Sequence, residues 1–506
     1  MALNLGPILQ FRGNTEEYLV SALVILDAAD KEPRCTAAGA KEVTCKAIAT
    51  IPFALPTMTA WRIEFHIIPG QARQIDYEIE GERGSFLVPA AGETPRIAYG
   101  SCNGYSDAKL MKAGDDHYER WRHLTDTHAK QPYHLLLMGG DQVYSDGMWK
   151  EIKEMADWLD LPADERFQTP LTSSMAAELD QYFCKIYVER WNKAKIAQAF
   201  RSIPTVMMWD DHDIMDGWGS YPYNWHNSPV YQGIFEIARR YFRLFQLQCD
   251  ANELHPASIK GANGFHLGFQ RLGKMSLLVP DLRSERQPKP DQIISLASWD
   301  AIYDWMANCP DEPARHLLVM SSIPVAYQDL GTIEKLLGVL PGQQELEDDL
   351  RDHWSSPAHI QERKRLVHRL FSHAKSKRAR VTILSGDVHV GALSVIESTR
   401  DAEAERGEAV INQLISTGIV HPPPPALVRY VLETNASSVE QVDQGITATM
   451  QPLAGRNHYL IGARNWLAIE PDPQNRLWCN WHVEGVETPH TKVIHPVKVT
   501  AAPGEK

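Results

Sequence analysis

Four short apolar segments of this chain each run directly into side chains of the types that bind metal ions. These clusters are residues 99–103 (Tyr-Gly-Ser-Cys-Asn), 140–144 (Gly-Asp-Gln-Val-Tyr), 209–213 (Trp-Asp-Asp-His-Asp) and 385–389 (Ser-Gly-Asp-Val-His). Carboxylate, thiolate, imidazole and phenolate groups are all metal ligands. Because the carboxyl ends of parallel strands lie at one edge of a sheet, we expect the four clusters to converge in space. The sequence therefore predicts a metal-dependent catalytic site.

The second cluster follows the most apolar of these segments. Residues 134–138 (His-Leu-Leu-Leu-Met) predict a central strand that is buried on both faces. Gly139 and Gly140 then end the strand and allow a ligand to approach the backbone closely. Asp141 follows at the edge where α/β sheets place their ligands. Tyr144 lies one turn further on, and we expect it to reach the same space.

Each cluster taken alone also has a purely structural explanation. A single cysteine is usually a buried small apolar residue, and an Asp-x-His pair is often a hydrogen-bonded surface pair. Only the four clusters together indicate a site. Two other functions stay open: a cysteine hydrolase with Cys102 as nucleophile, and a non-catalytic module that binds a metal or a phosphorylated partner. Residues 268–275 resemble a nucleotide-binding loop, but Met275 stands where a hydroxyl is needed, so we reject it.

Composition limits the class of protein. The chain has 506 residues, which suggests two or three domains, and its 43% hydrophobic content is enough for a full core. The net charge of −13 argues against general binding to nucleic acid or to anionic membranes. No apolar run approaches the ~20 residues of a membrane helix. The seven scattered cysteines and the absence of a signal peptide lead us to expect a cytoplasmic protein without a disulfide framework.

Hydrophobic periodicity predicts two kinds of domain and a tail. Residues 1–94 contain short segments with strict alternation, such as 61–67 and 75–79, which predict a small β-sandwich of immunoglobulin or fibronectin type. Residues 95–485 alternate between strand and helix patterns, which predicts an α/β domain. Residues 486–506 are expected to be a polar tail. Within the α/β domain we expect helices at 106–129, 148–159, 174–200, 229–248 and 358–375, a hairpin at 265–281, and strands at 96–99, 134–138, 203–209, 316–321, 381–384, 390–397 (the partner of 381–384) and 477–483.

The order and spacing of the four clusters resemble those of the alkaline phosphatase D-like (PhoD-like) metallophosphatases. These enzymes belong to the calcineurin-like phosphoesterase superfamily. The resemblance covers residues 96 to about 485 and implies a calcineurin-like α/β sandwich preceded by an all-β domain. The chain departs from many relatives at Asp213, where they have glutamate, and it is expected to differ from the secreted members in lacking a twin-arginine signal.

The resemblance implies two or more metal ions, with Asp141 bridging a pair of them. Cys102, Tyr144 and His389 would complete the first site. Since a phenol with a pKa of about 10 must be ionised there, this site favours Fe(III). The second site would be held by Asp387 together with Asp211, or with Asp210 in its place. Oxygen ligands favour calcium, magnesium or manganese, with zinc as an alternative.

The resemblance also implies the reaction. A metal-bound hydroxide would hydrolyse phosphomonoesters or phosphodiesters of small molecules. His212 is the predicted general acid for the leaving group. Arg283 is predicted to hold a phosphate oxygen, and the alternative for Arg283 is a surface ion pair. The physiological substrate and the oligomeric state are left open.

Overall fold

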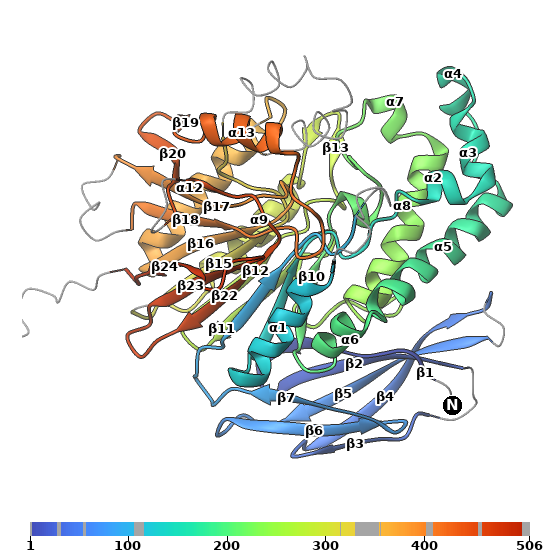
Figure 1. The fold of residues 1–506 in the computed structure, drawn as a ribbon, viewed down its shortest axis with the longest axis horizontal. Coiled ribbons are helices and arrows are strands. Elements are labelled where there is room, and N and C mark those ends of the chain that lie inside the picture. The colour runs from blue at the N-terminus through green and yellow to red at the C-terminus, as the bar shows by residue number, and fades with distance from the viewer. Residues whose placement is uncertain are drawn as a thin grey trace, which may run out of the picture. The chain divides into compact units, whose positions relative to one another are not determined.

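A computed structural model describes residues 3–27, 32–53, 57–105, 116–313, 315–328, 354, 356–400, 408–453 and 458–497 (Figure 1). The chain divides into two compact units. The first comprises Met1–Ala98 and Cys102–Ala257, and the second comprises Tyr99–Ser101 and Ser258–Lys506. The division passes through the short buried strand β8 (Ile97–Gly100). No helix in the described ranges is both long enough and apolar enough to cross a membrane.

The first unit is built on a mixed sheet that contains the predicted central strand. The neighbouring strands of this sheet are, in order, β9 (Leu135–Gly139), β10 (Thr205–Met208), β1 (Leu3–Gly13), β2 (Tyr18–Asp27), β5 (Met58–Ile67) and β4 (Glu42–Ile51). Strand β1 pairs with β10 in parallel and with β2 in antiparallel orientation. Every residue of β9 is buried, as its apolar sequence predicts. A separate small sheet consists of β3 (Cys35–Ala38), β6 (Arg73–Ile79) and β7 (Glu82–Val88).

Two helices of the first unit, α5 (Ser173–Trp191) and α8 (Pro229–Tyr241), begin at a residue whose side chain caps the helix. The Thr172 side chain accepts a hydrogen bond from Met175 N–H at the start of α5, and Ser228 caps α8, which has proline in its first turn. A five-residue π-helix, η3 (Phe242–Gln246), follows α8. The helices are α1 (Glu119–Lys130), α2 (Met148–Glu151), α3 (Lys153–Leu159), α4 (Ala163–Arg166), α5 (Ser173–Trp191), α6 (Ala194–Phe200), α7 (Tyr223–His226) and α8 (Pro229–Tyr241). The first ten residues of the helix predicted for 106–129 lie outside the described residues.

The second unit has a parallel core with antiparallel strands at its edges. Its main sheet has the order β11 (Leu267–Leu272), β12 (Met275–Val279), β15 (Arg315–Ser321), β16 (Ala379–Ser385), β18 (Val410–Ile415), β17 (Gly391–Ser398), β20 (Ile446–Gln451) and β19 (Val439–Asp443). Strands β12, β15, β16 and β18 run parallel to one another. The remaining elements are β13 (Gln287–Pro288), β14 (Asp291–Gln292), β21 (Leu460–Ile461), β22 (Asn465–Pro471), β23 (Leu477–Val483), β24 (His490–Ile494), α9 (Leu296–Ala307), α12 (Ile360–Lys377) and α13 (Ala426–Asn435).

Two sequence expectations differ from the structure here. Strand β17 is not the partner of β16, as expected for 390–397, because β18 lies between them. Strand β18 pairs with β16 in parallel and with β17 in antiparallel orientation, so β18 takes the place beside β16 that the sequence pattern assigned to β17. Strand β24 also occupies part of the segment expected to be a tail. The domain boundaries at 94 and 485 stay a prediction, and the two compact units divide the chain elsewhere.

Buried histidines make the stability of the protein sensitive to acid. Burial lowers the pKa of His128, His134, His316 and His373 to about 4 in each case. The unfolded chain therefore protonates first as the pH falls through 6.5, and the folded state loses stability between pH 6.5 and 4. We expect the free energy of unfolding to fall between pH 7.5 and pH 5 by up to about 2 kcal/mol for each histidine. Urea unfolding at the two pH values measures this.

Two substitutions are compared in this experiment, one at a buried histidine and one at an exposed histidine. His316 Nε2 donates to Asn475 O at 2.7 Å, and we expect the amide of His316→Gln to donate in its place without a titrating ring. We expect His316→Gln to flatten the pH dependence and exposed His458→Gln to leave it unchanged. Equal unfolding free energies of the unsubstituted chain at both pH values would contradict the assignment.

Candidate metal centre

Five of the predicted ligands come together in the first unit. Asp141, Asp210 and Asp211 each place one carboxylate oxygen within 4.8 Å of the others, and all three are buried. Tyr144 Oη lies 3.4 Å from Asp141 Oδ2, and the Cys102 thiol hydrogen-bonds with the Tyr144 side chain. Both candidates for the carboxylate ligand after β10 therefore lie in the cluster. The structure forms a compact group of thiol, phenol and carboxylate ligands from three strand ends.

The backbone of these loops is held in an unusual conformation. Cys102 has φ 54° and Asp141 has φ 53°, in the left-handed region that disfavours residues with a Cβ. Cys102 N–H donates to Gly140 O at 3.2 Å and Asn103 N–H donates to Asp141 O at 2.8 Å, so the two loops hold each other. In the second unit Asp387 and His389 have φ 71° and 51°. Eight non-glycine residues have positive φ in the described ranges, and four of them are predicted ligands, as expected where strain serves a function.

The electrostatics of the cluster favour a cation. Burial raises the pKa of Asp141 well above its usual value, and the neighbouring carboxylates Asp210 and Asp211 raise it further, although His212 opposes them. Asp141 Oδ1 is buried and accepts no hydrogen bond from the residues that the structure describes. A buried carboxylate oxygen of this kind is normally paired or bound to a metal. The residues present therefore fit the metal centre that the sequence predicts.

The pKa of Tyr144 shows what kind of ion its phenol would need. Burial raises this pKa well above its usual value, and the nearby Cys102 and Asp141 raise it further. The phenol therefore stays protonated unless a strong Lewis acid ionises it. Which ion meets this requirement stays a prediction.

Asp213 supports the cluster and is not itself in it. Its carboxylate accepts hydrogen bonds from the backbone N–H groups of Gln142 (3.1 Å), Val143 (3.2 Å) and Asp210 (2.9 Å), and from Gln246 Nε2 (2.9 Å). Burial raises its pKa to about 7 against the lowering effect of these hydrogen bonds. One carboxylate thus ties the two ligand-bearing loops to the π-helix η3, where Gln246 is located. π-Helical turns of this kind often lie at functional sites.

Asp213→Asn is expected to weaken the centre without removing a ligand. Asp213 Oδ2 accepts a hydrogen bond from Asp210 N–H. An asparagine Nδ2 at the same place is itself a donor, so the hydrogen bond from Asp210 N–H would be lost. We expect a loss of about 1–3 kcal/mol in the free energy of unfolding and of about 10–100-fold in metal affinity. Urea unfolding and competition with a metal indicator measure the two. Exposed Asp157→Asn is the control, and an unchanged metal affinity in Asp213→Asn would contradict the supporting role.

His212 lies beside the cluster in a pair that the sequence reasoning missed. Its Nδ1 is 2.6 Å from Asp146 Oδ2, and its ring stacks on Tyr144 with centroids 4.3 Å apart. Asp146 Oδ1 in turn accepts Asp216 N–H at 2.8 Å. Burial by itself lowers the pKa of His212, but Asp146 and Asp211 raise it, and the net direction is well above the usual value. Asp146 stands two residues after Tyr144, and this proximity was the available signal.

Three predicted site residues belong to the second unit. Asp387 is buried, and the ring of His389 stacks on His421 with centroids 3.6 Å apart. Arg283 is fully buried, so the alternative of a surface ion pair does not hold for it. Arg283 N–H donates to Asp281 Oδ1 at 3.0 Å, which fixes the backbone of its loop. The roles of Asp387, His389 and Arg283 stay predictions.

Comparisons with known proteins bear on the fold and on the family of this chain. An uncharacterized protein of Saccharomyces cerevisiae (strain ATCC 204508 / S288c), YGR266W, is 27% identical over 487 residues, which cover 79% of this chain and 68% of the yeast protein. A solved structure of PhoD superposes with a TM-score of 0.57 at 13% identity, over 98% of this chain and 92% of that one. This likeness confirms the predicted α/β fold with its β-rich N-terminal part. The model of the family described as PhoD related phosphatase matches residues 83–344 and 336–456. Since these residues make up more than half of the chain, the protein belongs to the PhoD-related phosphatase family.

Proposed function

We propose that this protein is a metal-dependent phosphoesterase that hydrolyses phosphate esters of small molecules. The observation that carries the proposal is Asp141, a buried carboxylate without a hydrogen bond on Oδ1 from described residues, placed between Asp210, Asp211 and Tyr144. Membership of a phosphatase family supports the reaction class. The expected cytoplasmic location is part of this proposal.

The candidate ligands fall into two sets, and each set suits a different kind of metal ion. Cys102 and Tyr144 would hold an ion such as Fe(III), and Asp210 and Asp211 would hold calcium, magnesium, manganese or zinc, with Asp141 shared by both. From the motif resemblance, we assign His389 to the first set and Asp387 to the second. When bound there, the ions would supply Lewis-acid activation of water and of the phosphate ester.

The chain itself positions the proton and the substrate. Asp146 holds the His212 ring through Nδ1, so Nε2 is the atom from which a proton passes to the departing oxygen. The stacked Tyr144 ring fixes the plane of the imidazole. Buried Arg283 is the proposed group for a phosphate oxygen, which a guanidinium binds with two parallel hydrogen bonds.

Metal removal tests the proposal directly. Metal analysis of the purified protein, chelation and re-addition of single ions should be combined with turnover of one monoester and one diester. We expect bound metal, loss of at least about 100-fold in turnover after chelation, and recovery with metal. Turnover that survives complete removal of metal would overturn the proposal.

The same preparation distinguishes the proposed metal-dependent reaction from the alternative of a cysteine hydrolase. Cys102 is buried and is reached only when the fold opens locally, and a thiolate bound to metal is protected further, so iodoacetamide should label Cys102 faster in the chelated protein than in the metal-loaded one. A nucleophilic Cys102 would be labelled in the metal-loaded protein, and its turnover would be lost.

A further inference from the structure

A cavity of about 380 Å³ lies next to the carboxylate cluster within the first unit. Tyr144 and Asp146 line this cavity and also belong to the site, since Tyr144 contacts Asp141 and Asp146 holds His212. Two side chains of the site therefore form part of the wall of this cavity. The volume is in the range of about 300–1,000 Å³ that is typical of small-molecule sites.

Besides Tyr144, three more tyrosines give the cavity flat aromatic walls. Tyr105, Tyr118 and Tyr182 line it, together with Arg190 from α5. The Arg190 guanidinium lies 4.9 Å from the centre of the Tyr105 ring and donates from Nη1 to Tyr118 Oη at 3.3 Å. These contacts fix the orientation of the side chains. Tyrosine rings and a guanidinium plane are the surfaces on which nucleobases stack.

The charges around the cavity are mixed, and most of the carboxylates have partners. Glu151 is paired with Lys185 at 3.3 Å, and Asp146 is paired with His212. The wall also carries Glu189 and the cations Lys150, Arg190 and Lys193. The lining therefore carries both signs of charge, and its aromatic side chains distinguish it more than its charges do.

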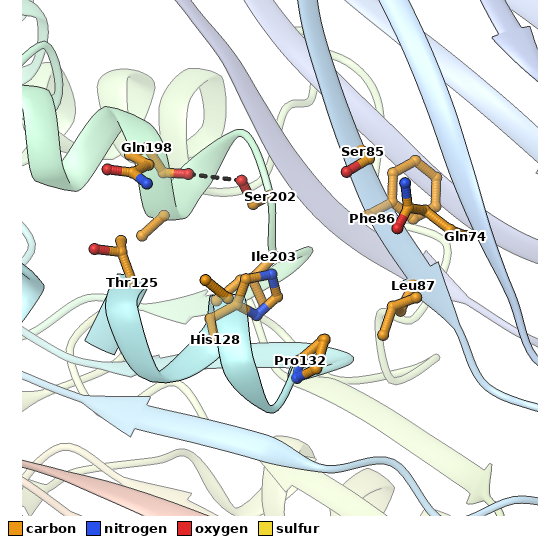
Figure 2. A pocket seen from close by; sticks show the side chains of 12 residues that line it. Gln74, Ser85, Phe86, Leu87, Thr125, His128, Pro132, Gln198, Ser202 and Ile203 are labelled. Carbon is orange, nitrogen blue, oxygen red and sulfur yellow. Dashed lines mark hydrogen bonds between the residues drawn. The ribbon is translucent and has the colours of Figure 1, made fainter. Parts of the chain in front are cut away.

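A second cavity in the first unit lacks these features. It measures about 260 Å³ and is lined mainly by neutral side chains of β6, β7, α1 and α6 (Figure 2). Its one imidazole, His128, already accepts Tyr133 N–H through Nδ1 at 3.0 Å. None of the cluster residues lines it, so it gives no indication of a substrate.

We propose that the cavity beside Tyr144 binds the leaving group and selects phosphate esters whose leaving alcohol carries a flat aromatic base, as in nucleoside monophosphates. This inference rests on the proposed function. Stacking of one base on such a wall favours the substrate by about 5–150-fold.

Two substrates with the same reacting atoms test the proposal. Adenosine 5′-monophosphate and ribose 5-phosphate release the same ribose 5′-hydroxyl and differ only in the base. We expect kcat/KM to be at least about tenfold higher for adenosine 5′-monophosphate, and the ratio to fall towards one in Tyr105→Leu. Tyr430→Leu, at an exposed tyrosine of α13, is the control and should keep the ratio.

The outcomes separate the two proposals. If the metal-loaded protein hydrolyses neither substrate, the proposed function fails and this inference fails with it. If it hydrolyses both at similar kcat/KM, or if Tyr105→Leu keeps the preference, the function stands and the aromatic cavity is overturned. A measurement without any variant is inhibition: adenosine should compete with ribose 5-phosphate and ribose should not, and equal inhibition by both also overturns the inference.

A second inference comes from a pair of thiols far from this site in the sequence. Cys35 on β3 and Cys45 on β4 place their sulfur atoms 3.1 Å apart, and both side chains are partly exposed. The other five cysteines are buried. The two strands belong to different sheets of the first unit, the small sheet and the edge of the large one. A bond here would connect the two sheets covalently.

We infer that Cys35 and Cys45 form a reversible disulfide by exchange with a low-molecular-weight disulfide such as oxidised glutathione. One protein thiolate attacks the small disulfide, releases one small thiol and forms a mixed disulfide. The second protein thiol then displaces the other small thiol and gives up its proton to solvent. The protein thiols are oxidised and the glutathione is reduced to two thiols, so atoms and electrons balance.

Equilibration in glutathione buffers of graded ratio, followed by alkylation and peptide mass mapping, tests the pair. We expect one peptide that joins Cys35 to Cys45, with a loss of about 2 Da relative to the reduced pair. Cys35→Ser should abolish it, and Cys309→Ser, at a buried thiol, should not. Separate alkylation of both thiols in oxidising buffer, or a mixed disulfide as the end product, would overturn the inference.

Discussion

Asp141→Asn is expected to lower turnover by at least about 1,000-fold, which is about 4 kcal/mol of activation barrier, and to stabilise the metal-free protein. The two effects have one cause. Asp141 is buried beside two other carboxylates, and its pKa is raised by burial and by those neighbours. A neutral amide removes this repulsion and also removes the shared ligand that the centre needs. Activity and the stability of the metal-free fold should therefore move in opposite directions.

Turnover of the metal-loaded protein and urea unfolding of the chelated protein measure the two effects. Exposed Asp157→Asn removes the same charge at the surface and should change neither quantity by much. If Asp141→Asn destabilised the chelated protein by several kcal/mol, the carboxylate would be a structural group. If it kept its turnover, Asp141 would not be a ligand of the reacting centre.

The effect of His212→Asn on kcat is expected to depend on the leaving group of the substrate. With an alkyl phosphate, whose departing oxygen must receive a proton, we expect kcat to fall by about 10²–10⁴-fold. With p-nitrophenyl phosphate, whose leaving group departs without a proton, we expect a fall of less than about tenfold. The measurement is kcat for both substrates in the same metal-loaded preparation.

Asp146→Asn should reproduce this pattern more weakly, because Asp146 acts through the His212 ring that it holds at 2.6 Å. His66→Asn, on β5, is the control. An equal loss of kcat on both substrates in His212→Asn would contradict proton donation and would indicate a role in binding or in the fold.

Local signals in the sequence were enough to predict which candidate ligands of the first unit lie close together. The apolar run before Asp141 becomes the buried strand β9, and the glycines after it allow the turn that places Asp141. The Asp-Asp-His-Asp cluster follows β10 in the same way and reaches the same point. Each of these inferences depends on a few adjacent residues. The alternation of apolar residues, the positions of glycines and the types of ligand residues are therefore sufficient to make these inferences.

Long-range pairing was not accessible in the same way. The positions of β1 beside β10, and of β18 between β16 and β17, depend on contacts between segments separated by many residues. The role of Asp213 was missed for the same reason, since Gln246 of the π-helix is 33 residues away. An apolar strand pattern shows that a strand is buried and does not show which strand lies next to it.

The left-handed conformation of Cys102, Asp141, Asp387 and His389 has a consequence for directed evolution of this fold. At each position glycine would relieve backbone strain of up to about 1–2 kcal/mol, although part of that gain is offset by the greater freedom of glycine in the unfolded chain. A library screened for heat resistance alone would therefore enrich glycine at the positions that we assign to metal ligands. Thermostable clones from such a screen should be sequenced at these four codons before any of them is carried forward.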